Sequence, residues 1–358
     1  MTEAKVGLAL SGGGFRATAF GLGCLRALQD ADVLPKVQVV SGVSGGSLLA
    51  ALWAYGPVEF AEFDAFTVDL LRRGMQLEIA GRTLAPHNLL RSAVNTGRAA
   101  LPWPRRRPRT FNRTEALRTT LASRAFGDRL ISEPNRPGLN TVISATDLIT
   151  ARTVRFGSNN SSCSQYGRIV EPVTVAEAVA ASAAYPVFLP AVERSFTFDQ
   201  AGQRRSVNVA LTDGGVYDNL GLSVLEPGRS PDFTNHVYDV DYIIACDAGR
   251  QELGSSGARF WPFRLYRSFY VTYRKTQDGG RAKLHLAAAA GHLRGFVHAY
   301  LGMRDERLPV PVPDLVPLAR VNAYRTSFRA VSPEDLAALT GRGEQLTQAL
   351  LGHYCPDL

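Results

Sequence analysis

One stretch, residues 37–53, constrains the fold of this chain more than any other. It opens with the β-branched run Val37–Val40, which predicts a buried strand, and it closes with an apolar, Ala- and Leu-rich run that predicts a helix. Between them, Gly42–Gly46 reads Gly-Val-Ser-Gly-Gly and contains a G-x-S-x-G pattern centred on Ser44. A sharp strand-to-helix turn of this composition is typical of a nucleophile elbow, in which a strained serine exposes its hydroxyl. The stretch therefore predicts an α/β chain with a nucleophilic Ser44.

The context of the pattern carries more weight than the pattern itself. In a chain with 33 glycines among 358 residues, a lone G-x-S-x-G has a chance expectation of roughly 0.2. Here it is flanked by a predicted strand and a predicted buried helix. The N–H groups at the start of that helix, with Gly45 the first of them, point at the place where an oxyanion would form beside Ser44. The alternative is a Gly-rich connection in an α/β domain that has no catalytic role.

A second glycine-rich turn follows the predicted first strand, Lys5–Leu10. Gly12–Ala17 fits the dinucleotide fingerprint G-x-G-x-x-A, with Asp30 and Asp32 at about the spacing of a ribose-binding acid. In a Rossmann unit that acid lies at the tip of the second strand, whereas this chain carries the serine turn there. We therefore favour an interpretation in which the backbone N–H groups of the loop form an oxyanion hole facing Ser44. Both turns would then lie at the carboxyl edge of one parallel sheet.

A serine hydroxyl is a poor nucleophile until a base takes its proton. Of the six histidines, His236 would complete the Ser, Asp, His order of α/β-hydrolases, but that fold places several strands before its elbow and only 43 residues precede Ser44 here. Asp213 is the better candidate because it follows the predicted strand Ser206–Leu211 in a Gly-rich turn, at the same sheet edge. A carboxylate with a pKa of about 3.9 is a weak base, so the site would have to raise that pKa by desolvation.

The net charge of +8 favours an anionic partner, either nucleic acid or an anionic membrane surface. Residues 98–113 hold six arginines and no acid around Trp103, which predicts an exposed basic loop or a contact with lipid headgroups. Trp261–Lys275 predicts a helix with aromatic and basic faces, and we favour a packed surface helix over an interfacial membrane helix. No nucleic-acid recognition motif accompanies the charge, so nucleic acid is not expected.

Four scattered cysteines without a C-x-x-C spacing suggest neither a zinc site nor a disulfide framework, which fits a reducing compartment. No apolar run reaches spanning length, and the apolar run near the amino terminus is too short for a signal-peptide core. We therefore expect a soluble, cytoplasmic protein that acts peripherally at the inner face of the membrane.

Taken together, four blocks resemble the patatin-like phospholipase family and occur in that family's order. They are Ser11–Arg16, Gly42–Gly46, Ala181–Pro190 and Asp213–Gly215. The resemblance spans residues 5 to about 250. It implies a three-layer α/β/α patatin-like fold with a mainly parallel central sheet, and a Ser–Asp dyad without histidine that acts on acyl esters of lipids.

Together with the helix after the elbow, the resemblance assigns roles to seven residues: the nucleophile Ser44, the base Asp213, an oxyanion hole at Gly12, Gly13, Gly14 and Gly45, and the loop arginine Arg16. That arginine either faces the substrate phosphate or holds the loop. The sequence departs from the family pattern at Ser11, where many members have Asp, at Ala17, where many have Gly, and at Asn219–Gly221, where Asn-Pro is frequent. These departures bear on substrate preference more than on catalysis.

We expect a single domain over residues 1–358, with a helical and basic insertion at 57–135 and a helical C-terminal extension at 251–358. The predicted activity is that of a phospholipase A or lysophospholipase, which works through an acyl-enzyme and needs no metal or organic cofactor. Two alternatives stay open: a Rossmann-like nucleotide-binding domain, and a basic membrane or nucleic-acid adaptor with a non-catalytic patatin fold.

Overall fold

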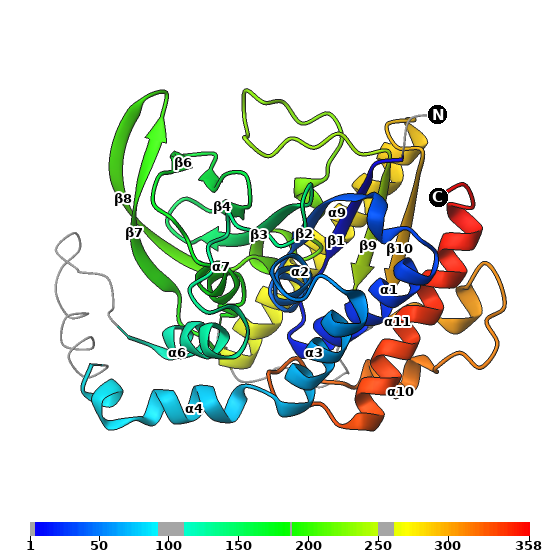
Figure 1. Ribbon diagram of the computed structural model, residues 1–358, viewed down its shortest axis with the longest axis horizontal. Coiled ribbons are helices and arrows are strands. Elements are labelled where there is room, and N and C mark those ends of the chain that lie inside the picture. The colour runs from blue at the N-terminus through cyan, green and yellow to red at the C-terminus, as the bar shows by residue number, and fades with distance from the viewer. Residues whose placement is uncertain (1–3, 92–110, 187, 250–260) are drawn as a thin grey trace.

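The computed structural model describes residues 4–91, 111–186, 188–249 and 261–358 (Figure 1). Within these ranges, ten strands form a single sheet in the order β10-β9-β1-β2-β3-β4-β5-β6-β7-β8. Most of the predicted basic loop at 98–113 lies outside the described residues.

The half of the sheet from β10 to β3 is parallel. Its strands are β1 (Val6–Leu10), β2 (Val37–Gly42), β3 (Asn140–Asp147), β9 (Tyr242–Asp247) and β10 (Gly295–Tyr300). Every residue of β1 and β9 is buried, as expected for parallel strands that are covered on both faces. The C-terminal region, which we expected to be helical, thus also contributes a strand to the sheet.

The other half is antiparallel, so the expectation of a mainly parallel sheet holds for only part of the fold. Its strands are β4 (Arg152–Gly157), β5 (Ser162–Cys163), β6 (Gly167–Ile169), β7 (Val192–Gln200) and β8 (Gln203–Asp213). β8 pairs with β3 as well as with β7, so this half closes on itself. The reason lies in the connections: β7 and β8 are joined by Ala201 and Gly202 alone, both at positive φ, and a two-residue link permits only an antiparallel pair.

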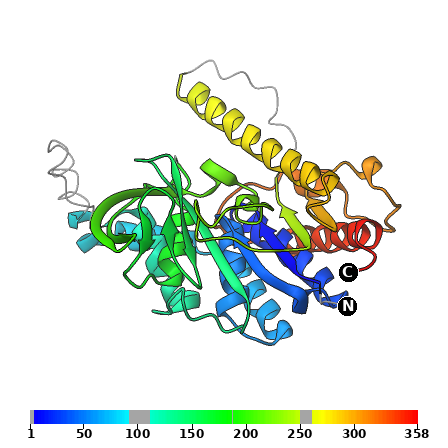
Figure 2. The ribbon, with the colours of Figure 1, turned by 90° about the horizontal axis from the view of Figure 1, so that it is seen from above.

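Helices cover both faces of the parallel half (Figure 2). On one face lie α1 (Phe15–Asp30), α2 (Gly45–Tyr55), α3 (Phe60–Arg73) and α11 (Pro333–Tyr354). α1 packs along α11 and against α2, and the larger hydrophobic core fills the space between these helices and the sheet. The other face carries α9 (Trp261–Ala289), above a smaller core. This half therefore has three layers, as expected.

The remaining helices flank the closed half or connect the strands. They are α4 (Gln76–Leu84), α6 (Arg113–Leu121), the π-helix Ala122–Phe126, α7 (Val175–Ser182), α8 (Gly215–Asp218), α10 (Leu318–Asn322) and the 3-10 turns Leu34–Lys36, Leu222–Val224 and Asp305–Arg307. α7 packs against β3 and β8, and so supports the end of the strand that carries Asp213. Among the described residues, none of the helices combines the length and apolar character that crossing a bilayer requires.

Candidate active site

The serine turn forms a strained strand-to-helix elbow. β2 ends at Gly42 and α2 begins at Gly45, so Ser44 stands between them with φ 53° and ψ −119°. A non-glycine residue at positive φ costs on the order of 1–3 kcal/mol and persists only where the surroundings fix it. Two contacts fix it here: the Ser44 N–H donates to Ser182 Oγ at 2.9 Å, and Ser47 Oγ donates to the Ser44 carbonyl at 2.6 Å.

The first glycine loop lies directly against this elbow. A Cβ at Gly45 would lie 2.1 Å from the Gly14 carbonyl oxygen, and one at Gly46 would lie 2.2 Å from the Leu10 carbonyl oxygen. Both distances are far below a van der Waals contact, so only glycine permits this approach. The two glycine-rich turns are therefore in contact at one edge of the sheet, where the sequence placed them.

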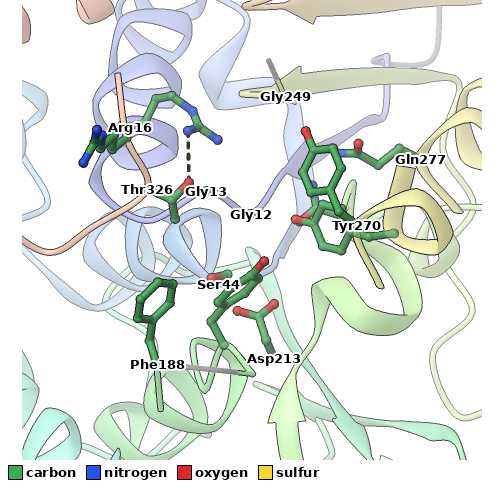
Figure 3. Close-up of a pocket in the computed structure, with 14 residues that line it drawn as sticks. Gly12, Gly13, Arg16, Ser44, Phe188, Asp213, Gly249, Tyr270, Gln277 and Thr326 are labelled. Carbon is green, nitrogen blue, oxygen red and sulfur yellow. Dashed lines mark hydrogen bonds between the residues drawn. The ribbon is translucent and has the colours of Figure 1, made fainter. Parts of the chain in front are cut away.

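Asp213 lies at the end of β8, where the pairing of β8 with β3 sets it opposite Ala145. Its side chain is buried and points toward Ser44 (Figure 3). Oδ1 accepts the Gly215 N–H at 2.7 Å, whereas Oδ2 has no hydrogen-bond partner in the described part of the chain. The Ser44 hydroxyl is near enough to lower the pKa of this carboxyl, although the pair does not have the geometry of a direct hydrogen bond.

Burial dominates the pKa of Asp213. Desolvation raises the pKa so strongly that it reaches about 6 instead of 3.8, even though the Ser44 hydroxyl and the Gly215 N–H both lower it. A pKa of about 6 makes this carboxylate a stronger base than an exposed one and leaves it mostly ionised at pH 7. The desolvation that base chemistry requires is therefore present.

The oxyanion loop differs in one detail from the expectation. The Gly12 N–H donates to the Asn219 carbonyl at 2.9 Å, so this group is occupied and not available to a substrate oxygen. The N–H groups of Gly13, Gly14 and Gly45 donate to no acceptor within the described ranges. Three of the four expected donors thus remain unpaired beside Ser44.

Arg16 is buried, and its guanidinium donates hydrogen bonds to residues from two distant segments of the chain. Its Nε donates to the Ala248 carbonyl at 3.0 Å, and its Nη1 donates to the Tyr324 carbonyl at 3.1 Å and to Thr326 Oγ1 at 3.0 Å (Figure 3). Of the two roles that the resemblance allows, these contacts favour the one in which the arginine holds the loop.

A cavity of about 290 Å³ opens above Ser44 and Asp213. It is lined by both glycine turns, by the end of β8 and by segments from the C-terminal region, namely Gly12, Gly13, Arg16, Ser44, Tyr185, Phe188, Asp213, Asn219, Gly249, Tyr270, Tyr273, Gln277, Arg325 and Thr326. Phe188 and Tyr270 lie on opposite sides of Ser44 (Figure 3). Four of the lining side chains are aromatic, Tyr185, Phe188, Tyr270 and Tyr273, and the walls therefore combine aromatic and polar groups.

Two contributors to the site, Ser182 and Tyr273, were not identified from the sequence. Ser182, from α7, accepts the Ser44 N–H and donates to the Ser144 carbonyl at 2.7 Å, so it fastens the elbow to β3. Tyr273, from α9, donates to Asn219 Oδ1 and so steadies the residue that holds Gly12. The only sequence signal for Tyr273 was the aromatic face of the predicted helix Trp261–Lys275, which also carries Tyr270, and the sequence analysis attributed that face to packing.

None of the described lining residues is a histidine. His236 is buried away from the cavity near Arg155, and burial lowers its pKa to about 3. His298 Nε2 instead lies 3.0 Å from Asp247 Oδ2. Within the described ranges there is also no cluster of three or more His, Cys, Asp or Glu side chains that could hold a metal ion.

The two aspartates that the dinucleotide interpretation of Gly12–Ala17 requires for ribose binding lie far from the glycine loop. Asp30 is the last residue of α1, which begins at Phe15, so it lies roughly 22 Å along the helix from the glycine loop at 1.5 Å per residue. Asp32 follows it, and both side chains are exposed. Neither reaches the site.

Comparison with known proteins agrees with this architecture. The family model described as patatin-like phospholipase matches residues 8–225. The structure of human GIVD cytosolic phospholipase A2 is similar at a TM-score of 0.57 and 15% identity, over 98% of this chain and 62% of that one. Its complex with methyl gamma-linolenyl fluorophosphonate is similar at a TM-score of 0.53 and 17% identity, over 98% and 58%. At such identities the likeness concerns the fold, and the chain spans about three fifths of the length of these structures. No curated protein matches the sequence.

Proposed function

The chain belongs to the patatin-like phospholipase family, and from this premise we propose that it hydrolyses acyl esters of membrane lipids, as a phospholipase A or lysophospholipase. One observation carries the proposal: Ser44 stands on a strained elbow beside the buried Asp213, whose Oδ2 lacks a partner among the described residues, at the floor of a cavity that four aromatic side chains help to line. The name of the similar human structure, a cytosolic phospholipase A2, agrees with this substrate class.

In the first step, Asp213 Oδ2 accepts the Ser44 hydroxyl proton while Ser44 Oγ attacks the ester carbonyl carbon. The rise of the pKa from 3.8 to about 6 corresponds to about 3 kcal/mol of added proton affinity. The leaving alkoxide takes the proton back from Asp213, which leaves an acyl group on Ser44. The pair thus acts as a nucleophile and its base without a histidine.

The developing oxyanion lies near the free N–H groups of Gly13 and Gly14, in the loop before α1, and of Gly45, at the start of α2. Such donors act on the charge that forms in the transition state, and each contributes on the order of 10²–10³-fold to the rate. The dipole of α2 adds to their effect, since its positive end is directed at the same place. In the second step, a water molecule gives a proton to Asp213 and its oxygen attacks the acyl carbon. The bond between that carbon and Ser44 Oγ then breaks, Asp213 returns the proton to Ser44 Oγ, and the fatty acid is released.

The cavity suits one acyl chain better than a whole diacyl lipid. Its volume of about 290 Å³ lies just below the range of about 300–1,000 Å³ that is usual for ligand pockets. Aromatic walls at Tyr185, Phe188 and Tyr270 offer apolar contacts to an alkyl chain. We therefore place the scissile ester over Ser44 and the start of its acyl chain between these rings.

Peripheral contact with an anionic membrane is the second part of the proposal, and α9 is the element that would make it. Trp261, Leu265 and Val271 on this helix are 61%, 61% and 67% exposed, and the exposed Arg264 and Lys275 lie among them. Residues 261–275 contain no acidic side chain. Large apolar side chains mixed with cations are the pattern by which helices bind anionic lipid surfaces.

We propose the inner face of the cytoplasmic membrane as the place of action, since the four cysteines are unpaired and buried, which fits a reducing compartment. We also propose that residues 1–358 work as one catalytic unit. Its C-terminal region takes part in substrate selection, because Tyr270, Tyr273 and Thr326 line the cavity.

Fluorophosphonate labelling with mass mapping of the labelled peptide tests the nucleophile directly. We expect the label on Ser44, no label in Ser44→Ala, and full labelling in Ser195→Ala, which changes an exposed serine on β7. Loss of lipid ester hydrolysis in Ser44→Ala and in Asp213→Asn completes the expected result. A folded Ser44→Ala variant that keeps most of its hydrolytic activity would refute the proposal. A Ser44→Ala variant that still binds lipid, when the wild type hydrolyses none, would favour the adaptor alternative.

A further inference from the structure

Arg325 is a cation at the cavity that the sequence did not single out. It belongs to residues 324–327, between α10 and α11 and outside the matched range 8–225. Its side chain is exposed and lines the cavity. It makes no hydrogen bond or ion pair with any residue that the structure describes.

The other charged groups at the cavity already have roles. Among the described lining residues these are Arg16 and Asp213. Arg16 is buried and donates to Ala248, Tyr324 and Thr326, and Asp213 is the buried carboxylate beside Ser44. Arg325 is thus the one exposed cation among the described lining residues, and it is the group that an anion entering from solvent would meet.

The backbone on both sides of Arg325 is fixed to the catalytic loop. Arg16 Nη1 binds the Tyr324 carbonyl at 3.1 Å and Thr326 Oγ1 at 3.0 Å, and the Phe15 N–H donates to the Ser327 carbonyl at 3.0 Å. An anchored backbone that carries an unpaired guanidinium lowers the entropy cost of binding an anion. The same loop supplies the oxyanion donors, so the cation keeps a constant position relative to Ser44.

We propose that Arg325 binds the headgroup phosphate of a glycerophospholipid or lysophospholipid whose acyl ester lies over Ser44. The inference rests on the proposed function and narrows its substrate class to phosphate-bearing lipids. A guanidinium offers two parallel N–H donors that match two phosphate oxygens, a geometry that a neutral ester cannot use. Arg16, which the sequence analysis considered for contact with the substrate phosphate, instead anchors the backbone on both sides of Arg325.

The test compares two substrates that share one acyl chain, 1-oleoyl-lysophosphatidylcholine and 1-monooleoylglycerol, both in neutral detergent micelles. Arg325→Gln is expected to lower kcat/KM for the phospholipid by about 10–100-fold, the usual effect of losing hydrogen bonds to a charged group. The neutral lipid should be hydrolysed within about twofold of the wild-type rate. Arg325→Lys should lose less, because it keeps the charge without the paired donors. Arg329→Gln is the matched control: this arginine is also exposed but does not line the cavity.

Equal losses on both substrates, or no loss on either, would overturn the assignment of Arg325, as would a wild-type enzyme that hydrolyses only the neutral lipid. Inhibition of monooleoylglycerol hydrolysis by millimolar inorganic phosphate, relieved in Arg325→Gln, would point to a site for free phosphate and would equally overturn the headgroup assignment. These results differ from failure of the proposed function itself, in which the wild type hydrolyses neither lipid and fluorophosphonate does not label Ser44.

Discussion

Replacing Asp213 by Asn should stabilise the protein while abolishing its activity. At pH 7 the carboxylate is ionised in a buried place without a cationic partner, and Oδ2 has no hydrogen-bond partner among the described residues. Asparagine fits the same space without the charge. Its Oδ1 can still accept the Gly215 N–H, and its amide group can donate toward Ser44 Oγ.

The size of the effect follows from the pKa. The folded-state value of about 6 against 3.8 for the unfolded chain means that the folded protein binds the Asp213 proton more tightly. The free energy of unfolding therefore falls as the pH rises from about 4 to about 6, by about 3 kcal/mol in total. Below pH 4 the carboxyl is neutral in the folded state and the stabilities of wild type and Asp213→Asn should converge. Above pH 6 the variant should be the more stable by up to that amount.

Urea unfolding of both proteins between pH 4 and pH 8 measures this difference. Asp357→Asn serves as the control, since Asp357 is exposed near the C-terminus and has no partner among the described residues. A stability gap between wild type and Asp213→Asn that stays constant across this pH range would refute the reasoning. So would a variant that is less stable than the wild type at pH 7.

Three further predictions concern the site and the proposed membrane surface. The kcat/KM for an uncharged ester should rise with pH through an apparent pKa of about 6 and fall about tenfold per pH unit below it, because Asp213 must be ionised to act as base; a profile without an inflection between pH 5 and 7 would contradict this. Ser182→Ala should lower kcat by about 10-fold or more with little change in KM, since the Ser44 N–H loses its acceptor, and an unchanged kcat would exclude a positioning role. Trp261→Ala combined with Leu265→Ala should weaken binding to phosphatidylserine vesicles at least about 10-fold, whereas the more exposed pair Leu77→Ala and Leu84→Ala on α4 should not.

Local sequence patterns predicted where the candidate site residues lie in the fold. The elbow around Ser44 and the loop at Gly12–Gly14 depend on a strand, a turn and a helix that are contiguous in the chain, so residue periodicity and glycine placement were enough to find them. Asp213 also followed from local information, because the carboxyl end of a strand is a place where ligands bind. The sequence analysis also stated that desolvation would have to raise the pKa of Asp213, and burial does raise it in the structure.

The features that the sequence did not reveal depend on distant contacts. The direction of the Arg16 side chain is decided by a carbonyl and a hydroxyl more than 300 residues away, at Tyr324 and Thr326, and no local pattern specifies that partner. The closure of β8 on β3 pairs segments that are far apart in the sequence, with Asp213 opposite Ala145, and no local pattern specifies that pairing. Arg325 stands in an irregular segment without any periodicity.

Two buried aspartates at the ends of neighbouring parts of the sheet show how surroundings decide which carboxylate can act as a base. Asp247, at the end of β9, accepts Arg281 Nη2 at 2.6 Å and lies 3.0 Å from His298 Nε2, and these partners hold its pKa well below the usual range despite complete burial. Because Arg281 lies on α9, its ion pair with Asp247 ties this helix to the sheet, and Asp247 also accepts the Gly249 N–H at the cavity edge. Asp213 is as buried but has no cation beside it, and its pKa rises instead.

A carboxylate that is paired in this way does not take up a proton near neutral pH, whereas the unpaired one does. The fold therefore separates two tasks between residues of the same type. Asp247 fixes the helix that carries Tyr270 and Tyr273 to the cavity, and Asp213 exchanges the proton. Asp247→Asn should accordingly loosen α9 and lower stability at pH 7, which is opposite in sign to the effect expected for Asp213→Asn. If Asp247→Asn and Asp213→Asn both stabilised the protein, the ion pairing of the carboxylate could not explain why Asp247 has a structural role and Asp213 acts as the base.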